Sequence, residues 1–489
     1  MMDEKSEIIP KEREVFEHSK RIMASYGSRE LFQQWVMAAF GFTVFFYYEV
    51  VIGLNVILAA LAFSIYSVWN AVNDPLVGYL MEKIHMPWEK KYNLKRFPWL
   101  IIGVIPWLIS YFMIYMVPAE WDPIKDPRYN WPVFGWFLAT ICIYDTTVTL
   151  FDLNITSIYP VKFRGANERR TTTGMGAIFG IIGVVLSAII PPMFITTGVR
   201  ETYQIAALIT VMLGIVFFIF TIPGIWEDKK TREYYQQMCE MAKGEELESF
   251  FKTAKKVIKD KVLMSKILML FGFQVAVVML QTSAFYIVTY ILDMEASAIT
   301  FILGAMLLGA IIAIPFWLLI GNRLNNNKKL SLISACIMFF TFIPMIFVTG
   351  LIAWIIVLFL FGIALGGQWF SDPPTMADVL DDIAVRTRKR EQAIYFGYQV
   401  FFIKLGQTTI AITIAIVHSL TGFVGGAPSL KDLRAKSPTP DLALFGIRIH
   451  AAIVPAIILL IMIFVFWKFY DLTPDKVAAN KAKLKELRL

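Results

Sequence analysis

Charged side chains are scarce in this chain. Only 17% of its 489 residues are Asp, Glu, Lys or Arg, whereas 57% are hydrophobic and the mean hydropathy is +0.60. A soluble domain usually carries about 25% charged residues. This composition excludes an ordinary soluble domain and is typical of a membrane protein with many spanning segments.

Cysteine and histidine are also rare, and they form no pattern. The three cysteines are Cys142, Cys239 and Cys336, two in apolar runs and one in a polar segment, which predicts neither a disulfide framework nor a thiolate metal site. The four histidines are scattered along the chain. A phosphate-binding loop, a metalloprotease helix and a nucleophile motif are likewise missing. We therefore expect neither an enzyme nor a bound cofactor.

The chain shows no cleaved signal peptide, because residues 1–30 are polar and mixed in charge. The first spanning helix is then expected to serve as the targeting signal. Twelve apolar runs follow, each long enough to cross a bilayer as a helix. They cover residues 31–53, 55–81, 98–118, 132–160, 173–196, 202–226, 263–292, 297–321, 330–350, 352–378, 392–420 and 443–470.

Lysine and arginine orient these runs. If the N-terminus lies in the cytoplasm, the cytoplasmic segments carry 36 Lys and Arg residues and the loops on the other face carry 6. This asymmetry predicts a multi-pass protein of the cell membrane with both termini cytoplasmic. This excess of basic residues on the cytoplasmic side of the lipid bilayer also accounts for most of the net charge of +8. No nucleic acid partner is needed to explain that charge.

The longest polar interruption, at 227–262, divides the chain into six plus six spans, and its charged sequence predicts a helical linker. Two halves joined in this way are the layout of major facilitator carriers, which rock about a central site, although other twelve-helix folds share the count. We predict an all-α membrane protein of two six-helix bundles. Its segments are an N-terminal segment at 1–30, bundles at 31–226 and 263–470, the linker at 227–262 and a cytoplasmic tail at 471–489.

Polar residues share one face of the second run. Asn70, Asn73 and Asp74 stand at i, i+3 and i+4 in an otherwise apolar helix. A charge at the centre of a spanning helix costs about 2.5–3.5 kcal/mol, so it normally faces a cavity or a partner. These three residues are therefore candidates for a site inside the membrane.

The fourth run carries a second polar stripe. Asp145, Thr149 and Asp152 stand at i, i+4 and i+7. Carboxylate, amide and hydroxyl oxygens suit a hard cation such as sodium, whereas a buried carboxylate alone can carry a proton. A purely structural pairing with a basic residue is the alternative. Lys404, deep in the eleventh run, is the basic residue that we expect to pair with Asp74 or Asp152.

Two other acidic residues, Glu49 and Asp372, stand near the ends of their runs, where solvated, structural and functional roles all remain open. Candidates to line a substrate cavity are the polar residues Gln33, Gln34, Tyr48, Asp145, Thr156 and Gln399.

Four stretches resemble the glycoside–pentoside–hexuronide:cation symporter family, the melibiose-permease branch of the major facilitator carriers. They are "WNAVNDPLVGY" (69–79) with "KRFPWLIIG" (95–103), "LFDLNITSIYP" (150–160) with "ERR" (168–170), "MADVLDD" (376–382), and "EQAIYFGYQVFFIKLG" (391–406). The last two are also similar to the sodium-dependent lysophosphatidylcholine symporters. The resemblance implies a cation site formed by Asn70, Asn73, Asp74, Thr149 and Asp152, with Lys404 as the coupling residue.

The chain also departs from this family. Asn70 stands where the family usually has Asp, which leaves coupling to sodium, to a proton or to neither ion open. The sugar-binding pattern is largely absent: Gln33 or Gln34 stands in place of an Asp, Thr156 in place of a Trp, and an apolar residue near Ala177 in place of an Arg.

These features predict a monomeric cation-coupled symporter of a small organic solute such as a sugar or glycoside. One alternative is a carrier of an amphipathic lipid such as a lysolipid, because the sugar-binding residues are missing. The other, from a different class, is a membrane sensor that transports nothing.

Overall fold

The structure is a computed structural model that describes residues 18–83, 86, 94–163, 166–229, 231–233, 257–388 and 392–487. In this part of the chain the regular elements are helices, and no strand is found. Twelve of its helical segments are long and apolar enough to cross a membrane. The predicted all-α membrane protein with twelve spanning helices is confirmed.

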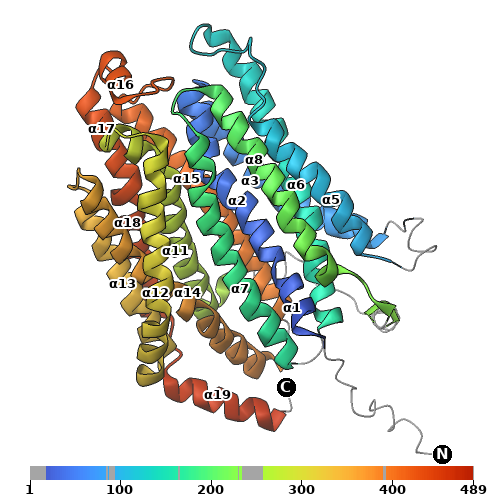
Figure 1. The fold of residues 1–489 in the computed structure, drawn as a ribbon. Helices are drawn as coiled ribbons and strands as arrows, with labels where there is room; N and C mark the ends of the chain where they lie inside the picture. Colours follow the sequence, from blue (N-terminus) through green and yellow to red (C-terminus); the bar gives the residue numbers. More distant parts are fainter. Residues whose placement is uncertain are drawn as a thin grey trace, which may run out of the picture.

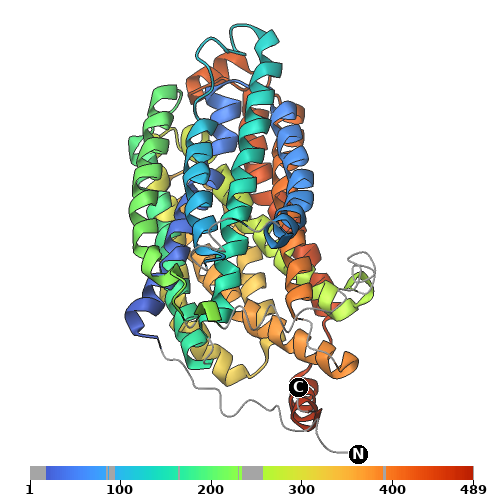
Figure 2. The ribbon, with the colours of Figure 1, turned by 90° about the vertical axis from the view of Figure 1, so that its right-hand side faces the viewer.

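The elements follow one another along the chain in two groups, which lie as two bundles of roughly aligned helices (Figures 1 and 2). The first group comprises α1 (Lys20–Gly27), α2 (Arg29–Phe46), η1 (Tyr47–Val51), α3 (Val56–Lys83), α5 (Phe97–Ile114), η2 (Pro127–Tyr129), α6 (Asn130–Lys162), α7 (Ala166–Ile189), η3 (Pro191–Phe194) and α8 (Arg200–Ile225). The second comprises α11 (Lys261–Tyr286), η4 (Ile287–Ile291), η5 (Ala296–Ala298), α12 (Ile299–Leu324), α13 (Asn327–Met345), α14 (Leu351–Thr387), α15 (Gln392–Thr421), α16 (Leu430–Lys436), α17 (Pro440–Arg448), η6 (Ile449–Ile453), α18 (Val454–Phe469) and α19 (Pro474–Leu487).

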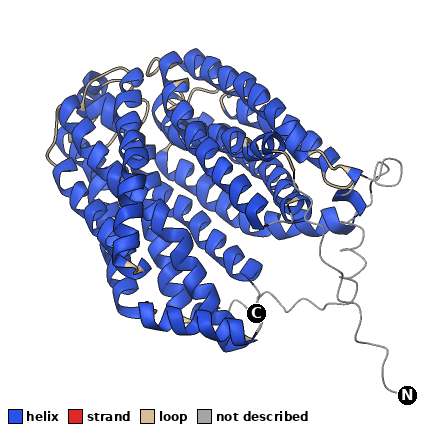
Figure 3. Ribbon diagram, turned by 60° about the horizontal axis from the view of Figure 1, so that its bottom comes forward, coloured by secondary structure: helices blue, strands red, loops and turns tan. Residues whose placement is uncertain are grey.

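Most of the packing lies within each group. In the N-terminal half α2 packs on α7 and α5 packs on α6, and in the C-terminal half α12 packs on α14 and α11 packs on α18. The halves meet where α3 packs on α15, α2 on α11 and α7 on α12. A view toward the lower end shows the two groups of helices side by side (Figure 3). Residues 230 and 234–256 of the predicted linker lie outside the described residues, so its helical character stays a prediction.

The outward surface of the bundles is apolar. On α8, for example, Ile205, Met212 and Phe220 are each at least half exposed. In water this surface would promote aggregation, whereas in a bilayer it faces acyl chains of matching polarity. The helices also satisfy their backbone hydrogen bonds internally, which is the condition for crossing the hydrocarbon layer.

The ends of the chain contain helices that the sequence pattern missed. α1 lies in the segment predicted as polar and N-terminal, α19 lies in the predicted tail, and α16 and α17 begin in the predicted loop 421–442. Both α1 and α19 lie at the same end of the molecule (Figure 1). An even number of spans requires this arrangement, but the side of the membrane on which they lie stays a prediction.

The break between the first two spans falls close to the predicted boundary between the runs 31–53 and 55–81. η1 ends at Val51 and α3 begins at Val56. Gly53 has φ +79°, a conformation that side chains rarely adopt. The turn carries α3 away from α2 at the end of the molecule opposite the termini.

Candidate functional site

Four polar side chains meet where α3 packs against α6. Asn70, Asn73, Asp145 and Thr149 are each at most 5% exposed. Asn70 donates a hydrogen bond from its amide nitrogen to Asp145. The amide nitrogen of Asn73 lies 3.2 Å from the Thr149 hydroxyl and 3.4 Å from a carboxylate oxygen of Asp145. The two polar stripes of the sequence therefore meet inside the N-terminal half.

Asp74 extends this group toward the C-terminal half. The hydroxyl of Thr149 donates to one oxygen of Asp74 at 2.7 Å. The other oxygen pairs with the Lys404 ammonium of α15. Both charged side chains are 33% exposed, so the pair is not enclosed by protein on all sides. The expected pairing of Lys404 with Asp74 is present, and it crosses between the halves.

The charges of this group do not balance. Asp74 and Asp145 are two carboxylates, whereas Lys404, which pairs with Asp74, is one basic side chain. In addition, the carbonyl oxygen of the buried Asn70 side chain has no hydrogen-bond partner. A buried carbonyl oxygen without a partner costs about 1–3 kcal/mol. An unmatched negative charge beside a free oxygen is the environment that a small cation requires.

The described contacts of Asp152 lie outside this group. It accepts a hydrogen bond at 3.0 Å from the amide of Gln33 on α2. The Arg29 guanidinium also interacts electrostatically with Asp152, and Arg29 pairs with its neighbour Glu30 at 2.9 Å. The charge of Asp152 thus has a basic neighbour of its own in the N-terminal half.

The other candidate cavity residues are dispersed. Gln34 packs against Gly183 of α7. Tyr48 is fully buried and donates to the carbonyl of Ile114 at 2.7 Å. Thr156 is exposed on α6. Gln399 accepts a hydrogen bond at 2.9 Å from Lys266. None of these contacts joins them to Asp145, the sixth candidate.

Two charged residues have partners that the sequence did not identify. Lys266 of α11 is 2% exposed and pairs with Asp372 of α14 at 2.7 Å. Lys266 was missed because it stands only four residues inside its apolar run, where a lysine normally reaches water. For Glu49 the sequence left solvated, structural and functional roles open. A solvated role is wrong, because the Glu49 side chain is 1% exposed and contacts His418.

An apolar groove lies between α3 and α15, on the side of the Asp74–Lys404 pair that is farther from the termini. Its volume is about 460 Å³, within the range of ligand pockets. Its lining residues come from α3 and α15: Ile57, Ala60, Leu61, Ser64, Ile412, Ala415, Ile416, Ser419 and Leu420. Leu61, Ile412 and Leu420 are 40% exposed or more, so the groove is open toward the outside of the bundle.

The groove continues the polar site along both helices. Lys404, Thr408 and Ile412 follow one another at four-residue steps on one face of α15. The hydroxyls of Thr408 and Ser67 are hydrogen-bonded to each other between the ion pair and the groove. The crossing of α3 and α15 is therefore charged at one end and apolar at the other.

Comparison with known proteins identifies the family. The family model described as MFS/sugar transport protein matches residues 25–474. The chain belongs to this family. Membership in the major facilitator family indicates a membrane transporter rather than an enzyme, and it agrees with the arrangement of two six-helix bundles.

Two relatives of this chain carry informative names. The sodium-dependent lysophosphatidylcholine symporter 1 of Gallus gallus is 23% identical over 486 residues, covering 92% of this chain and 86% of the relative. The sphingosine-1-phosphate transporter of Xenopus tropicalis is 22% identical over 419 residues, covering 76% and 78%. The chain is thus similar over most of its length to carriers named for lipid substrates.

Solved structures share the fold. The nucleoside transporter NupG superposes with a TM-score of 0.59 at 13% identity, covering 93% of this chain and all of that one. A D-xylose-proton symporter also gives a TM-score of 0.59 at 13% identity, covering 92% and 97%. At this identity the likeness concerns the fold alone.

Proposed function

We propose that this family member is a sodium-coupled symporter of an amphipathic lipid that has a polar headgroup and one acyl chain. The observation that carries the proposal is the crossing of α3 and α15, where a charged site continues into an open apolar groove. A sugar has polar groups on all sides and gains little from such a groove, whereas an acyl chain matches the apolar lining and, relative to water, gains about 0.8 kcal/mol for each buried CH₂ group. The names of the lipid-carrying relatives support the same choice.

The cation site that we propose consists of Asn70, Asn73, Asp74, Asp145 and Thr149. Its oxygens come from two carboxylates, one hydroxyl and one free amide carbonyl. Hard oxygen ligands of this kind suit an alkali cation. The donor set therefore favours sodium over a transition metal.

Asp145 has a specific part in this proposal. Asn70 stands where the family usually has Asp, so α3 lacks one carboxylate. The amide of Asn70 donates its hydrogen bond to Asp145 on the facing helix. Asp145 thus supplies to the same place the negative charge that α3 has lost. Asp152 is excluded from the proposed site because Gln33 and Arg29 hold it elsewhere.

Coupling follows from the ion pair between the halves. A cation that binds Asp74 and Asp145 competes with Lys404 for the same carboxylate. Lys404 belongs to the C-terminal half. Its release from Asp74 therefore changes the relative stability of two arrangements, one in which the halves are in contact at this ion pair and one in which they are apart. The released ammonium faces the polar end of the groove, where it attracts the anionic part of a headgroup.

Uptake into proteoliposomes tests the proposal. We expect a sodium gradient to drive accumulation of lysophosphatidylcholine and not of melibiose. Substituting Ser64→Phe fills the groove and is expected to reduce lysolipid uptake about three- to tenfold, because several CH₂ groups lose their place. The matched control is Ile65→Phe, the next residue of α3, which does not line the groove.

Three results would contradict the proposal: melibiose accumulation in place of lysolipid, a proton gradient that replaces sodium fully, or equal effects of the two Phe substitutions. The first rejects the substrate, the second rejects the ion, and the third rejects the groove.

A further inference from the structure

The segment that follows α15 crosses from the C-terminal half to the N-terminal half. Residues 422–429 connect α15 to α16 at the end of the molecule opposite the termini, here called the far end (Figure 1). Gly426 donates its backbone N–H to the carbonyl of Glu49 in η1 at 3.0 Å. The segment 422–429 therefore bridges the two halves, and we call it the strap.

The strap is fixed to its own half through its backbone. Three of its carbonyl groups accept hydrogen bonds from side chains of the C-terminal half. The pairs are Ser437 with Gly422 at 2.7 Å, Lys436 with Gly426 at 2.9 Å, and Tyr290 with Ala427 at 2.5 Å. Phe423 is also stacked on His418, with the ring centres 4.1 Å apart. Because these contacts lie within one half, the strap moves with α15 as an extension of the C-terminal half.

The strap meets the N-terminal half through two glycines. A Cβ atom added at Gly425 would lie 2.8 Å from the backbone carbonyl oxygen of Glu49. One added at Gly426 would lie 2.8 Å from the side chain of Ile124 and 3.8 Å from the Cα atom of Gly53, in the turn after η1. The two halves approach each other here so closely that a methyl group does not fit between them.

A matching segment of the N-terminal half reaches in the opposite direction. Residues 190–199 connect α7 to α8, and their short helix η3 packs on η5 and α12 of the C-terminal half. Gly198 of this segment lies against Pro428 of the strap, since a Cβ atom added at Gly198 would be 2.3 Å from the proline ring. Each half therefore extends one loop over the other at the far end, and the two loops touch.

The strap covers the polar contact beneath it. The hydroxyl of Tyr286 on α11 donates to one carboxylate oxygen of Glu49 at 2.5 Å, and Nδ1 of His418 lies 2.7 Å from the other. The side chain of Glu49 is 1% exposed, and Gly426 is buried above its backbone carbonyl. The strap must therefore leave η1 before this end of the molecule can open.

We propose that the strap is the latch that closes the far end of the carrier. In carriers of this fold the halves rock about a central site, so each end opens in one part of the cycle. The strap moves with the C-terminal half and closes the far end by placing Gly425 and Gly426 against Glu49, Gly53 and Ile124. It touches them through backbone and apolar atoms, so the steric fit at the two glycines sets the stability of the closed arrangement.

The latch is separate from the proposed cation site. Lys404 and Gly422 stand about five helical turns apart along α15, and neither Asp74 nor Asp145 contacts the strap in the described interactions. The inference depends on neither the substrate nor the ion. A failure of the sodium or lysolipid experiments would leave it standing, and its own failure would leave the proposed function standing.

Gly425 offers a specific way to disturb the latch. Its φ angle lies outside the left-handed region, so alanine fits the backbone of the strap itself. The atoms nearest to an added Cβ all belong to Glu49 in the other half. A methyl group at this position therefore collides while the halves are together at the far end, and the collision disappears when they separate. Gly425→Ala should shift the carrier toward opening of the far end.

Distances between two spin labels measure this opening. The three native cysteines of the full chain are replaced by Ser, and the labels are attached at Glu120→Cys and Lys431→Cys, which are exposed residues of the two halves at the far end. The distance distribution of the purified protein is recorded at fixed pH and sodium, without substrate. The matched control is Gly350→Ala, just before α14 at the same end, where an added Cβ meets nothing within 4 Å.

The two alanine variants should differ clearly. We expect the ratio of long-distance to short-distance molecules to rise at least about fivefold in Gly425→Ala, because only the closed arrangement must accommodate the methyl group. Gly350→Ala should stay within about twofold of the native ratio, since its methyl group has free space. A native-like distribution in Gly425→Ala, or an equal shift in both variants, would overturn the latch.

Ile124→Ala keeps the test decisive if Gly425→Ala fails to fold. Ile124 lies on the loop between α5 and η2 and is 49% exposed, so its truncation should leave the fold intact. The shorter side chain leaves a gap beside Gly53 and Gly426 in the closed arrangement, and we expect the same ratio to rise about two- to fourfold. An unchanged distribution in this variant would also overturn the proposal.

Discussion

Two acidic residues of the N-terminal half each reach a basic residue of α15, and the two contacts differ in how deeply they are buried. Asp74 and Lys404 are each one third exposed, whereas Glu49 and His418 are almost completely buried. The exposed pair can therefore exchange one partner for an ion from solution, whereas the buried pair changes only when the halves separate.

The comparison also explains why one helix can serve both functions. α15 runs from the end near the termini to the opposite end, and α3 follows it along the apolar groove. A movement of α15 relative to the N-terminal half affects both contacts together. Changes at either pair should therefore act on the same equilibrium.

Removal of Lys404 is expected to have the largest effect. Lys404→Leu leaves Asp74 and Asp145 without their ammonium partner, so the sites on the two halves are no longer linked. We expect sodium-driven accumulation of lysolipid in proteoliposomes to fall at least about tenfold, which corresponds to 1.4 kcal/mol or more. Accumulation equal to that of the native protein would show that Lys404 takes no part in coupling.

Asp74→Asn should have a smaller and more selective effect. The amide keeps the size of the side chain and its hydrogen bond with Thr149, but removes a charged ligand. We expect sodium-driven uptake to fall about tenfold, while exchange of lysolipid without a gradient falls less than threefold. Equal losses in both assays would point to a damaged substrate site rather than to coupling.

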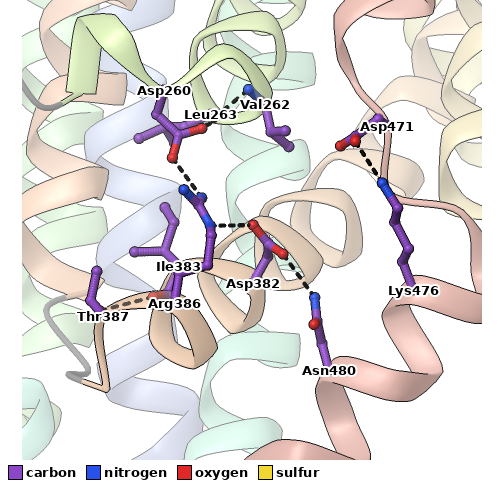
Figure 4. Close-up of polar contacts among 10 residues, drawn as sticks. All are labelled: Asp260, Val262, Leu263, Asp382, Ile383, Arg386, Thr387, Asp471, Lys476 and Asn480. Atoms are coloured by element: carbon purple, nitrogen blue, oxygen red, sulfur yellow. Dashed lines mark hydrogen bonds and ion pairs between the residues drawn. The ribbon is translucent and has the colours of Figure 1, made fainter.

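The smallest effect is expected for an ion-pair group that lies within one half. Arg386 joins Asp260, at the start of α11, to Asp382 on α14, and Asn480 of α19 donates to Asp382 (Figure 4). Arg386 is 49% exposed, and such pairs contribute about 0.2–1 kcal/mol. Arg386→Ala should lower the melting temperature by less than about 2 °C.

Transport is the second measurement on this variant. Because Arg386 does not join the halves, Arg386→Ala should leave sodium-driven uptake within about twofold of native. A tenfold loss of uptake at normal stability would show that the end near the termini also contributes to coupling, and the contrast between the two pairs on α15 would then be incomplete.

Much of the fold could be predicted from the sequence, because a spanning helix needs a long apolar run and the chain has twelve. The face of Asn70, Asn73 and Asp74 also follows from helical spacing. The stripe of Asp145, Thr149 and Asp152 was harder to interpret. Seven residues of helix rise about 10 Å, so its two carboxylates cannot share one small site, and the sequence does not reveal which one meets α3.

Other parts of the arrangement depend on tertiary packing. Glu49 lies in a short π-helix, and its two partners are more than 200 residues away in the sequence, so no local pattern predicts its burial. Lys266 stands near the start of its span, where spacing alone suggests contact with water. The helices α16 and α19 are short and polar, and an apolar run is the signal that they lack.

The sodium dependence of two Asp→Asn variants tests the central claim most directly. Asp145 and Asp152 stand on the same stripe of α6, but only Asp145 belongs to the proposed cation site. We expect Asp145→Asn to raise the sodium concentration for half-maximal lysolipid uptake by at least about tenfold, since an amide replaces a charged ligand. Asp152→Asn should raise it by less than threefold. The reverse order would contradict this account, because the cation would then depend on the carboxylate that Gln33 and Arg29 hold.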